Sequence, residues 1–139
     1  MKNIDKAKSI LLENGYTCVL YKDGEEYHSV ERGVKPLLGF LETNKDFKGF
    51  SAADKTVGAG AAHLYVLLGV SAVFANVISE EGRMVLESSG IEVFYEKLVP
   101  FIINRAGNGP CPIETAVKGI EDSSKALKII KETILKLNG

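Results

Sequence analysis

Two short segments hold the residues whose types and spacing could do chemistry: SAADKTVGAG at 51–60 and GNGPCPIE at 107–114. In the first, Asp54 and Lys55 are a charged pair at the start of a segment that we predict to be a buried helix from Asp54 to Leu68. Burial disfavours a charged lysine, so the Lys55 amine would become a nucleophile or a general base, although Asp54 would oppose this. The alternative is an Asp54 N-cap followed by a lysine that reaches solvent.

Small residues around this pair would let a ligand approach the backbone closely, and Ser51 and Gly58 are candidate ligand-binding residues. A helix N-terminus at this place would favour an anion. The G-x-G spacing at 58–60 is typical of a dinucleotide fingerprint, which must directly follow a strand. We expect no such site, because these glycines lie inside the predicted helix. We expect His63 to pack in the interior.

The second segment places Cys111 at the N-cap of a long final helix that is predicted to begin at Pro112. The N-terminus of a helix stabilises a thiolate. Glu114 either bonds back to the N-cap backbone, as in a capping box, or accepts the proton of the thiol. Gly109 belongs to a glycine loop that could hold a phosphate. The candidate catalytic residues are Asp54, Lys55, Cys111 and Glu114, and the candidate ligand-binding residues are Ser51, Gly58 and Gly109.

The composition is typical of one ordinary globular domain, which we predict over 1–139. Hydrophobic residues make up 45% of the chain and charged residues 25%, which excludes a disordered protein. Seventeen basic and eighteen acidic residues give a net charge of −1, so we expect no nucleic-acid or membrane partner. Two cysteines cannot build a disulfide framework, and the charged start lacks the pattern of a secretory signal. We therefore expect a cytoplasmic protein.

Apolar periodicity predicts the elements that must position these residues: helices over 4–14, 34–41 and 79–89, a hairpin over 17–30, strands over 71–78 and 91–95, and an edge strand over 99–104. Asn14-Gly15 is typical of a helix end and Asp23-Gly24 of a tight turn, and Ser79 followed by two glutamates is typical of an N-cap. The segment between Lys55 and Glu80 has no charged residue and is long enough to span a membrane. It changes at Gly69 from Ala/Leu-rich to rich in β-formers, which favours a buried helix followed by a buried strand. The order of elements predicts an α/β fold, a three-layer α/β/α sandwich with one mixed sheet.

The phrases ERGVKPLL, SAADKTVGAGAA, LVPFIINR and GPCPIE together resemble an uncharacterised bacterial family, domain of unknown function 1893, which is assigned a cytidine deaminase-like fold. The resemblance covers nearly the whole chain and implies that fold. Cytidine deaminases place H-x-E at the start of one buried helix and P-C-x-x-C at the start of the next, so that zinc activates a water. The corresponding positions here, 54–56 and 79–82, lack these ligands, and the 111–114 motif lacks the second cysteine. The resemblance therefore implies a retained pocket with altered chemistry, in which Lys55 occupies the zinc region.

We expect no zinc and no other cofactor, because Cys18, His28, His63 and Cys111 lack metal-ligand spacing. The leading hypothesis is a nucleotide or ribose-phosphate-like ligand bound around Asp54/Lys55 and Cys111/Glu114. An enzyme with this site would be zinc-independent and would use Lys55 or Cys111 as the nucleophile. The alternatives are a regulatory module that binds without turnover and a structural homo-oligomer without a ligand.

Overall fold

One mixed sheet of five strands organises the chain, which the computed structural model describes over residues 1–104 and 106–138. The spatial order of the strands is β2-β1-β3-β4-β5. β1 is antiparallel to both β2 and β3, whereas β3, β4 and β5 are mutually parallel. The strands are β1 (Cys18–Lys22), β2 (Glu25–Ser29), β3 (Ser51–Val57), β4 (Ala72–Ser79) and β5 (Glu92–Val99).

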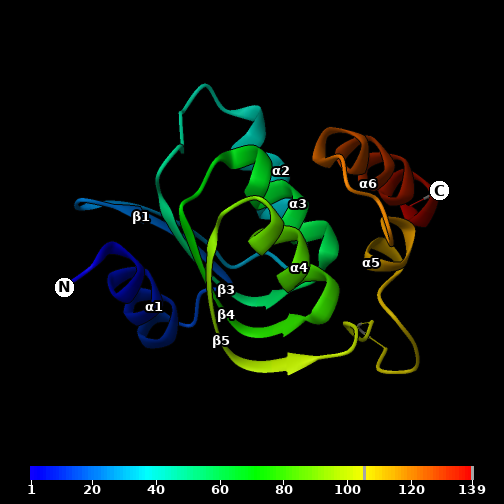
Figure 1. The fold of residues 1–139 in the computed structure, drawn as a ribbon, viewed down its shortest axis with the longest axis horizontal. Coiled ribbons are helices and arrows are strands. Elements are labelled where there is room, and N and C mark those ends of the chain that lie inside the picture. The colour runs from blue at the N-terminus through cyan, green and yellow to red at the C-terminus, as the bar shows by residue number, and fades with distance from the viewer. Residues whose placement is uncertain (105, 139) are drawn as a thin grey trace.

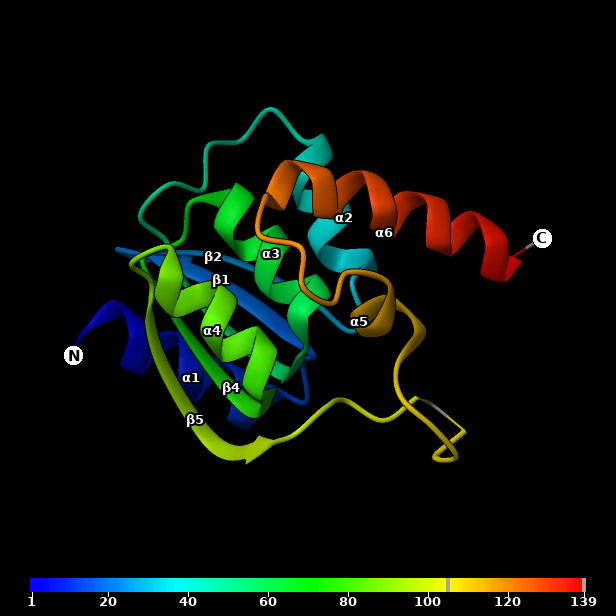
Figure 2. The same cartoon turned by 45° about the vertical axis from the view of Figure 1, so that its right-hand side comes forward.

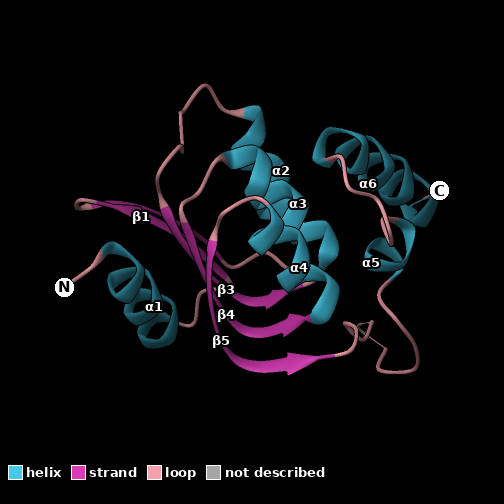
Figure 3. Ribbon diagram, viewed as in Figure 1, coloured by secondary structure: helices cyan, strands magenta, loops and turns pink. Residues whose placement is uncertain are grey.

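Helices cover both faces of the sheet, which confirms the predicted three-layer α/β/α architecture (Figures 1 and 3). α1 lies on one face, and α2, α3 and α4 lie on the other. α6 packs against α3 on the side away from the sheet, and α5 lies beside it (Figure 2). The helices are α1 (Asn3–Asn14), α2 (Lys35–Glu42), α3 (Ala59–Leu68), α4 (Glu80–Ser88), α5 (Pro112–Ala116) and α6 (Ser123–Asn138).

The uncharged segment between Lys55 and Glu80 supplies the centre of this core. α3 is buried on nearly every side, and the first four residues of β4 are buried as well. Ala53 and Phe74 pack under α1, whereas Ala52 and Val73 pack on the opposite face with α3. A strand buried on both faces has a continuous apolar sequence, which explains the absence of charge here. Among residues 1–104 and 106–138, no helix has the length and hydropathy needed to cross a membrane.

The predicted helix over 54–68 is wrong in its first part, because residues 51–57 form strand β3 and α3 begins only at Ala59. β3 lies between β1 and β4 and pairs with both. Its small residues Ala52 and Ala53 favour a helix by propensity, but hydrogen bonding on two sides and burial decide in favour of a strand. Gly58 therefore follows a strand directly, and the stated objection to a dinucleotide fingerprint is wrong as well.

The predicted final helix is also wrong, because it is two helices. α5 has five residues, and the chain turns at Gly119, which has a φ of 77°, before α6 starts. The Asp122 Oδ1 atom accepts a hydrogen bond from the backbone nitrogen of Ser124 at 2.9 Å and so caps the new helix. The predicted strand over 99–104 is absent from the described part of the chain, where only an isolated bridge joins Ile103 to Pro110.

Candidate functional site

The carboxylate of Glu114 joins three segments that are distant in sequence. Its Oε2 atom accepts hydrogen bonds from the Ala59 backbone nitrogen at 2.7 Å and from the Ser79 hydroxyl, and its Oε1 atom accepts one from the Ile102 backbone nitrogen at 2.7 Å. The residue is only 8% exposed. Ala59 is the first residue of α3, so the carboxylate also lies at the positive end of the helix dipole. We call these four residues the Glu114 junction.

Ser79 connects the junction to the next helix. It is the last residue of β4 and the N-cap of α4, as the sequence predicted. Its hydroxyl oxygen accepts a hydrogen bond from the Gly82 backbone nitrogen at 3.0 Å while its proton is donated to Glu114. A side chain at position 82 would come within 3.0 Å of the Val57 carbonyl oxygen, so only glycine lets α4 start this close to the end of β3. The junction therefore fixes the starts of α3 and α4 relative to each other.

Asp54 belongs to a separate buried cluster with Tyr65 and Cys18. The Tyr65 hydroxyl donates to Asp54 Oδ2 at 2.6 Å, and the Thr56 backbone nitrogen donates to Oδ1 at 3.1 Å. The Cys18 sulfur lies 3.3 Å from the Tyr65 hydroxyl oxygen. Burial raises the pKa of Asp54 to about 7, and it raises the pKa values of Cys18 and Tyr65 as well. The described residues show no hydrogen bond between this cluster and Glu114.

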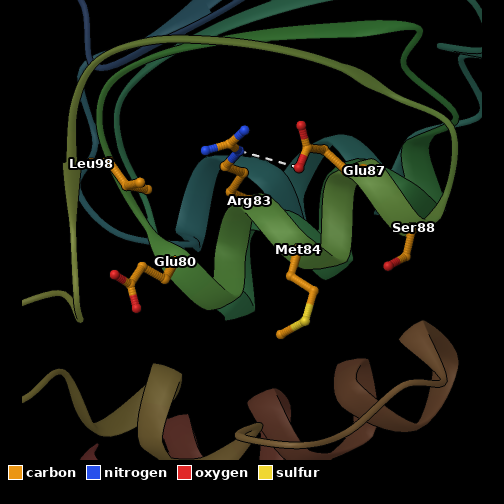
Figure 4. A pocket seen from close by; sticks show the side chains of 6 residues that line it. All are labelled: Glu80, Arg83, Met84, Glu87, Ser88 and Leu98. Atoms are coloured by element: carbon orange, nitrogen blue, oxygen red, sulfur yellow. Dashed lines mark hydrogen bonds and ion pairs between the residues drawn. The ribbon is translucent and has the colours of Figure 1, made fainter.

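A groove of about 580 Å³ runs along α4 and begins one residue after Ser79 (Figure 4). Arg83 projects from α4 and is held in place by two neighbours. Its Nε atom lies 3.2 Å from Glu87 Oε1, and its Nη1 atom donates to the Tyr95 hydroxyl at 3.1 Å. The groove is lined by Glu80, Arg83, Met84, Glu87, Ser88 and Leu98. In Figure 4, Arg83 and Glu87 extend to one side of α4 and Met84 and Ser88 to the other, so the lining is spread over the exposed face of the helix.

The family model for domain of unknown function DUF1893 matches residues 6–134. The chain belongs to this family. A crystal structure of a DUF1893 family protein from Thermotoga maritima is similar to it with a TM-score of 0.86 and 23% sequence identity, over 95% of this chain and 90% of that one. The family resemblance and the α/β fold are thus confirmed. The apo form of dCMP deaminase from the cyanophage S-TIM5 has a TM-score of 0.45 and 14% identity, over 70% of this chain and 94% of that one. No curated protein is significantly similar to the chain.

In this DUF1893 protein, the carboxylate of Glu114 lies between the start of α3 and the start of α4. The resemblance to deaminases had implied Lys55 for that region, which is wrong because Lys55 lies within β3 with an exposed side chain. The predicted capping box is wrong too, since Glu114 bonds to none of the backbone of its own helix start, and the Cys111 backbone nitrogen donates to the Ile102 carbonyl at 2.8 Å. Among residues 1–104 and 106–138, no group of three His, Cys, Asp or Glu side chains is arranged to hold a metal ion.

The other predicted site residues are not gathered in one pocket. Cys111 is the N-cap of α5, as predicted, and its thiol is free and half-exposed. Gly109 lies in the preceding loop, where its carbonyl accepts from the Asn104 backbone nitrogen at 2.8 Å. Gly58 contacts the junction, since a side chain there would come within 3.0 Å of Glu114 Oε2. Ser51 lies at the opposite end of the seven-residue strand β3.

Sequence reasoning missed three features of the candidate site: the roles of Ser79 and Tyr65 as hydrogen-bond donors to buried carboxylates, and the groove at Arg83. One available signal pointed to the junction. Gly58 is the N-cap of α3 and has no side chain that could accept a hydrogen bond from the first turn. A buried helix that starts in this way needs an acceptor from elsewhere in the chain, and Glu114 supplies it. His63 packs in the interior, as predicted, with its Nδ1 atom 2.9 Å from the Ser123 hydroxyl.

Proposed function

We propose that this protein binds a small nucleotide or ribose-phosphate-like molecule in the groove along α4. The observation that carries the proposal is the lining of the groove, where Arg83 lies among Met84, Leu98 and two carboxylates in about 580 Å³. The groove is shallow and open, so a bound molecule would lie along α4 with part of its surface exposed to solvent. The mixture of apolar and polar groups also fits a ligand that has a flat ring at one end and a charged group at the other.

Each part of such a ligand has a partner in the groove. The ring would pack on Met84, which is 59% exposed, and on Leu98. The guanidinium of Arg83 has further N–H groups for one phosphate, in the planar geometry that oxyanions favour. The carboxylates of Glu80 and Glu87 would accept hydrogen bonds from ribose hydroxyls, as acidic residues do in dinucleotide sites. Because two carboxylates oppose a single cation, a nucleoside monophosphate suits the groove better than a triphosphate.

In this account the Glu114 junction is structural support for the groove. Both oxygens of Glu114 already accept hydrogen bonds from chain groups, so the carboxylate is not free to act as a general base. Lys55 is exposed on β3 and Cys111 lies at the start of α5, and neither residue lines the groove. We therefore favour a binding or regulatory protein over an enzyme.

Isothermal titration calorimetry of the full chain tests this proposal with two probes, adenosine monophosphate and adenosine. We expect saturable binding of both, with the monophosphate tighter. Arg83→Gln should weaken the monophosphate about tenfold and leave adenosine nearly unchanged, because it removes only the partner of the phosphate. Arg32→Gln, at an exposed arginine outside the groove, is the matched control. Absence of binding, or equal losses in both variants, would overturn the proposal.

A further inference from the structure

Asn108 lies between two glycines in the loop that precedes α5, and it is exposed. Gly107, before it, has a φ of 73°. At Gly109, after it, the nearest described atom to the position of an added Cβ atom is Asn104 Nδ2, at 3.7 Å. A glycine on each side gives the backbone at Asn108 more conformational freedom than other residue types would allow. The binding function proposed for the groove makes no use of this loop.

The carboxamide of Asn108 is paired with that of Asn104. Asn104 Nδ2 donates a hydrogen bond to Asn108 Oδ1 at 3.0 Å, and the Asn108 backbone nitrogen donates to Asn104 Oδ1 at 3.2 Å. A donor at a carbonyl oxygen stabilises the negative charge that develops there when a nucleophile attacks the carbonyl carbon. The Asn104 amide therefore favours attack on Asn108 Cγ.

The Gly109 backbone nitrogen is the nucleophile that follows this carbon in the chain. Within residues 1–104 and 106–138 it donates no hydrogen bond. We propose that Asn108 is a site of spontaneous covalent modification, at which attack by this nitrogen converts the asparagine to aspartate and isoaspartate.

The chemistry needs only water as a co-reactant. The Gly109 nitrogen forms a bond to Asn108 Cγ, the bond from Cγ to Nδ2 breaks, and the proton of the Gly109 nitrogen leaves with Nδ2 as ammonia. The product is a succinimide ring. Water then adds to either carbonyl carbon of the ring and breaks its bond to the nitrogen, which leaves isoaspartate or aspartate at position 108.

Asn14 provides the contrast, because it is also followed by a glycine. It is the last residue of α1, and its Nδ2 atom donates to the Ile10 carbonyl oxygen at 2.9 Å. Side chains on a helix lean toward the helix N-terminus, so this contact holds the Asn14 carboxamide away from the Gly15 nitrogen. The same pair of residues is thus protected in α1 and open to reaction in the loop.

Isoaspartate at position 108 would change the hydrogen bonds of the loop. The Asn104 backbone nitrogen donates to the Gly109 carbonyl oxygen at 2.8 Å and so closes the loop. Isoaspartate adds a carbon atom to the main chain inside this closure, which displaces the Gly109 carbonyl from its donor. The nearby Ile102 nitrogen donates to Glu114, so the modified loop would lie next to the Glu114 junction. This proposal is independent of any ligand.

Peptide mapping of the full chain by mass spectrometry, after incubation at mildly alkaline pH, tests the proposal. We expect Asn108 to gain the mass difference between an amide and an acid at least about tenfold faster than Asn14. In urea α1 is lost and the two rates should converge. The third Asn-Gly sequence, at 138–139, is scored separately. Equal rates at Asn14 and Asn108 in the folded protein, or an Asn108 that reacts only in urea, would overturn the proposal.

The products identify the route. Two chromatographically distinct products of equal mass at position 108 are expected, because a succinimide opens at either carbonyl. Direct hydrolysis of the amide by water gives aspartate alone, and that single product would contradict attack by the Gly109 nitrogen.

Asn104→Asp tests the role of the neighbouring amide. Its carboxylate can still accept from the Asn108 backbone nitrogen but has no N–H for Asn108 Oδ1. The reaction at Asn108 should therefore slow about threefold to tenfold, the equivalent of one hydrogen bond. Asn44→Asp, at an exposed asparagine outside the loop, is the matched control and should leave the rate unchanged. Equal rates in both variants would contradict the role assigned to Asn104.

Discussion

The backbone nitrogen of Ala59 lies 2.7 Å from the carboxylate of Glu114, although 55 residues separate them in the chain. The first turn of α3 thus takes its hydrogen-bond acceptor from α5, a helix beyond the sheet (Figure 2). The same carboxylate holds Ser79 at the start of α4. Because α4 carries most of the groove, this contact links the position of α5 to the shape of the proposed binding site.

Replacing this carboxylate should cost stability. Glu114→Gln keeps the size of the side chain but offers one acceptor oxygen to three donors, so at least one donor loses its partner. We expect the free energy of unfolding to fall by about 1–3 kcal/mol, the usual penalty for an unsatisfied buried group. Urea denaturation of the variant beside Glu121→Gln, at an exposed carboxylate, measures the difference. Equal stability of the two variants would show that the junction does not hold the fold together.

Close packing of α5 against α3 gives a second prediction, at Gly60. A Cβ atom added there would come within 2.6 Å of Ile113 Cγ2, and within 3.7 Å of Ile130. Gly60→Ala should therefore destabilise the protein by about 1–3 kcal/mol through overpacking. Gly39→Ala is the matched control, because Gly39 lies in α2 with no atom near its added methyl group. Alanine favours a helix, so this control should raise the melting temperature. A stabilising effect at both positions would contradict the packing described here.

The raised pKa of Asp54 predicts how the stability of the protein depends on pH. Its pKa is about 7 in the folded protein, because burial disfavours the carboxylate, and its usual value is 3.8. The folded state keeps a proton that the unfolded state releases between these two values. The contribution of Asp54 to stability is therefore complete below about pH 4 and is lost as the pH rises through 7. Within this window the slope approaches about 1.4 kcal/mol per pH unit.

Asp54→Asn isolates this contribution, since asparagine does not titrate. Urea denaturation of both proteins should show the wild type losing stability relative to the variant between about pH 4 and about pH 7, with little further change above this range. Other titrating groups are shared by the two proteins and cancel in the difference. A difference in stability that stays constant over this range would mean that Asp54 is ionised throughout.

Local signals were sufficient for much of this fold. Asn14-Gly15 predicted the end of α1, where Gly15 has a φ of 66°, and Asp23-Gly24 predicted the turn between β1 and β2, where both residues have positive φ. Ser79 followed by two glutamates predicted the start of α4. In each case a backbone conformation or a cap requires particular residue types at that position, so the sequence is informative without knowledge of the tertiary contacts.

The wrong predictions concern residues whose structure is determined by contacts with segments distant in the sequence. Ala52 and Ala53 carry no strand signal of their own, and they form a strand because β1 and β4 pair with them on both sides. A glutamate three residues after an N-cap gives the same sequence pattern whether its side chain caps its own helix or, like that of Glu114, binds the start of α3. Lys55 and Asp54 are adjacent in the sequence, but strand geometry sends their side chains to opposite faces of β3, and only Asp54 is buried. A helix pattern could not reveal that separation.

The central claim, that the groove along α4 is a binding site, is tested most directly by an NMR titration of the isotope-labelled chain with adenosine monophosphate. The account predicts saturable shifts of the backbone amides of residues 80–88 and of Leu98, with small shifts around Cys18 and Asp54. The Arg83→Gln variant should need about tenfold more ligand to reach half of its maximal shifts. Shifts confined to another part of the molecule, or no shifts at millimolar ligand, would contradict it.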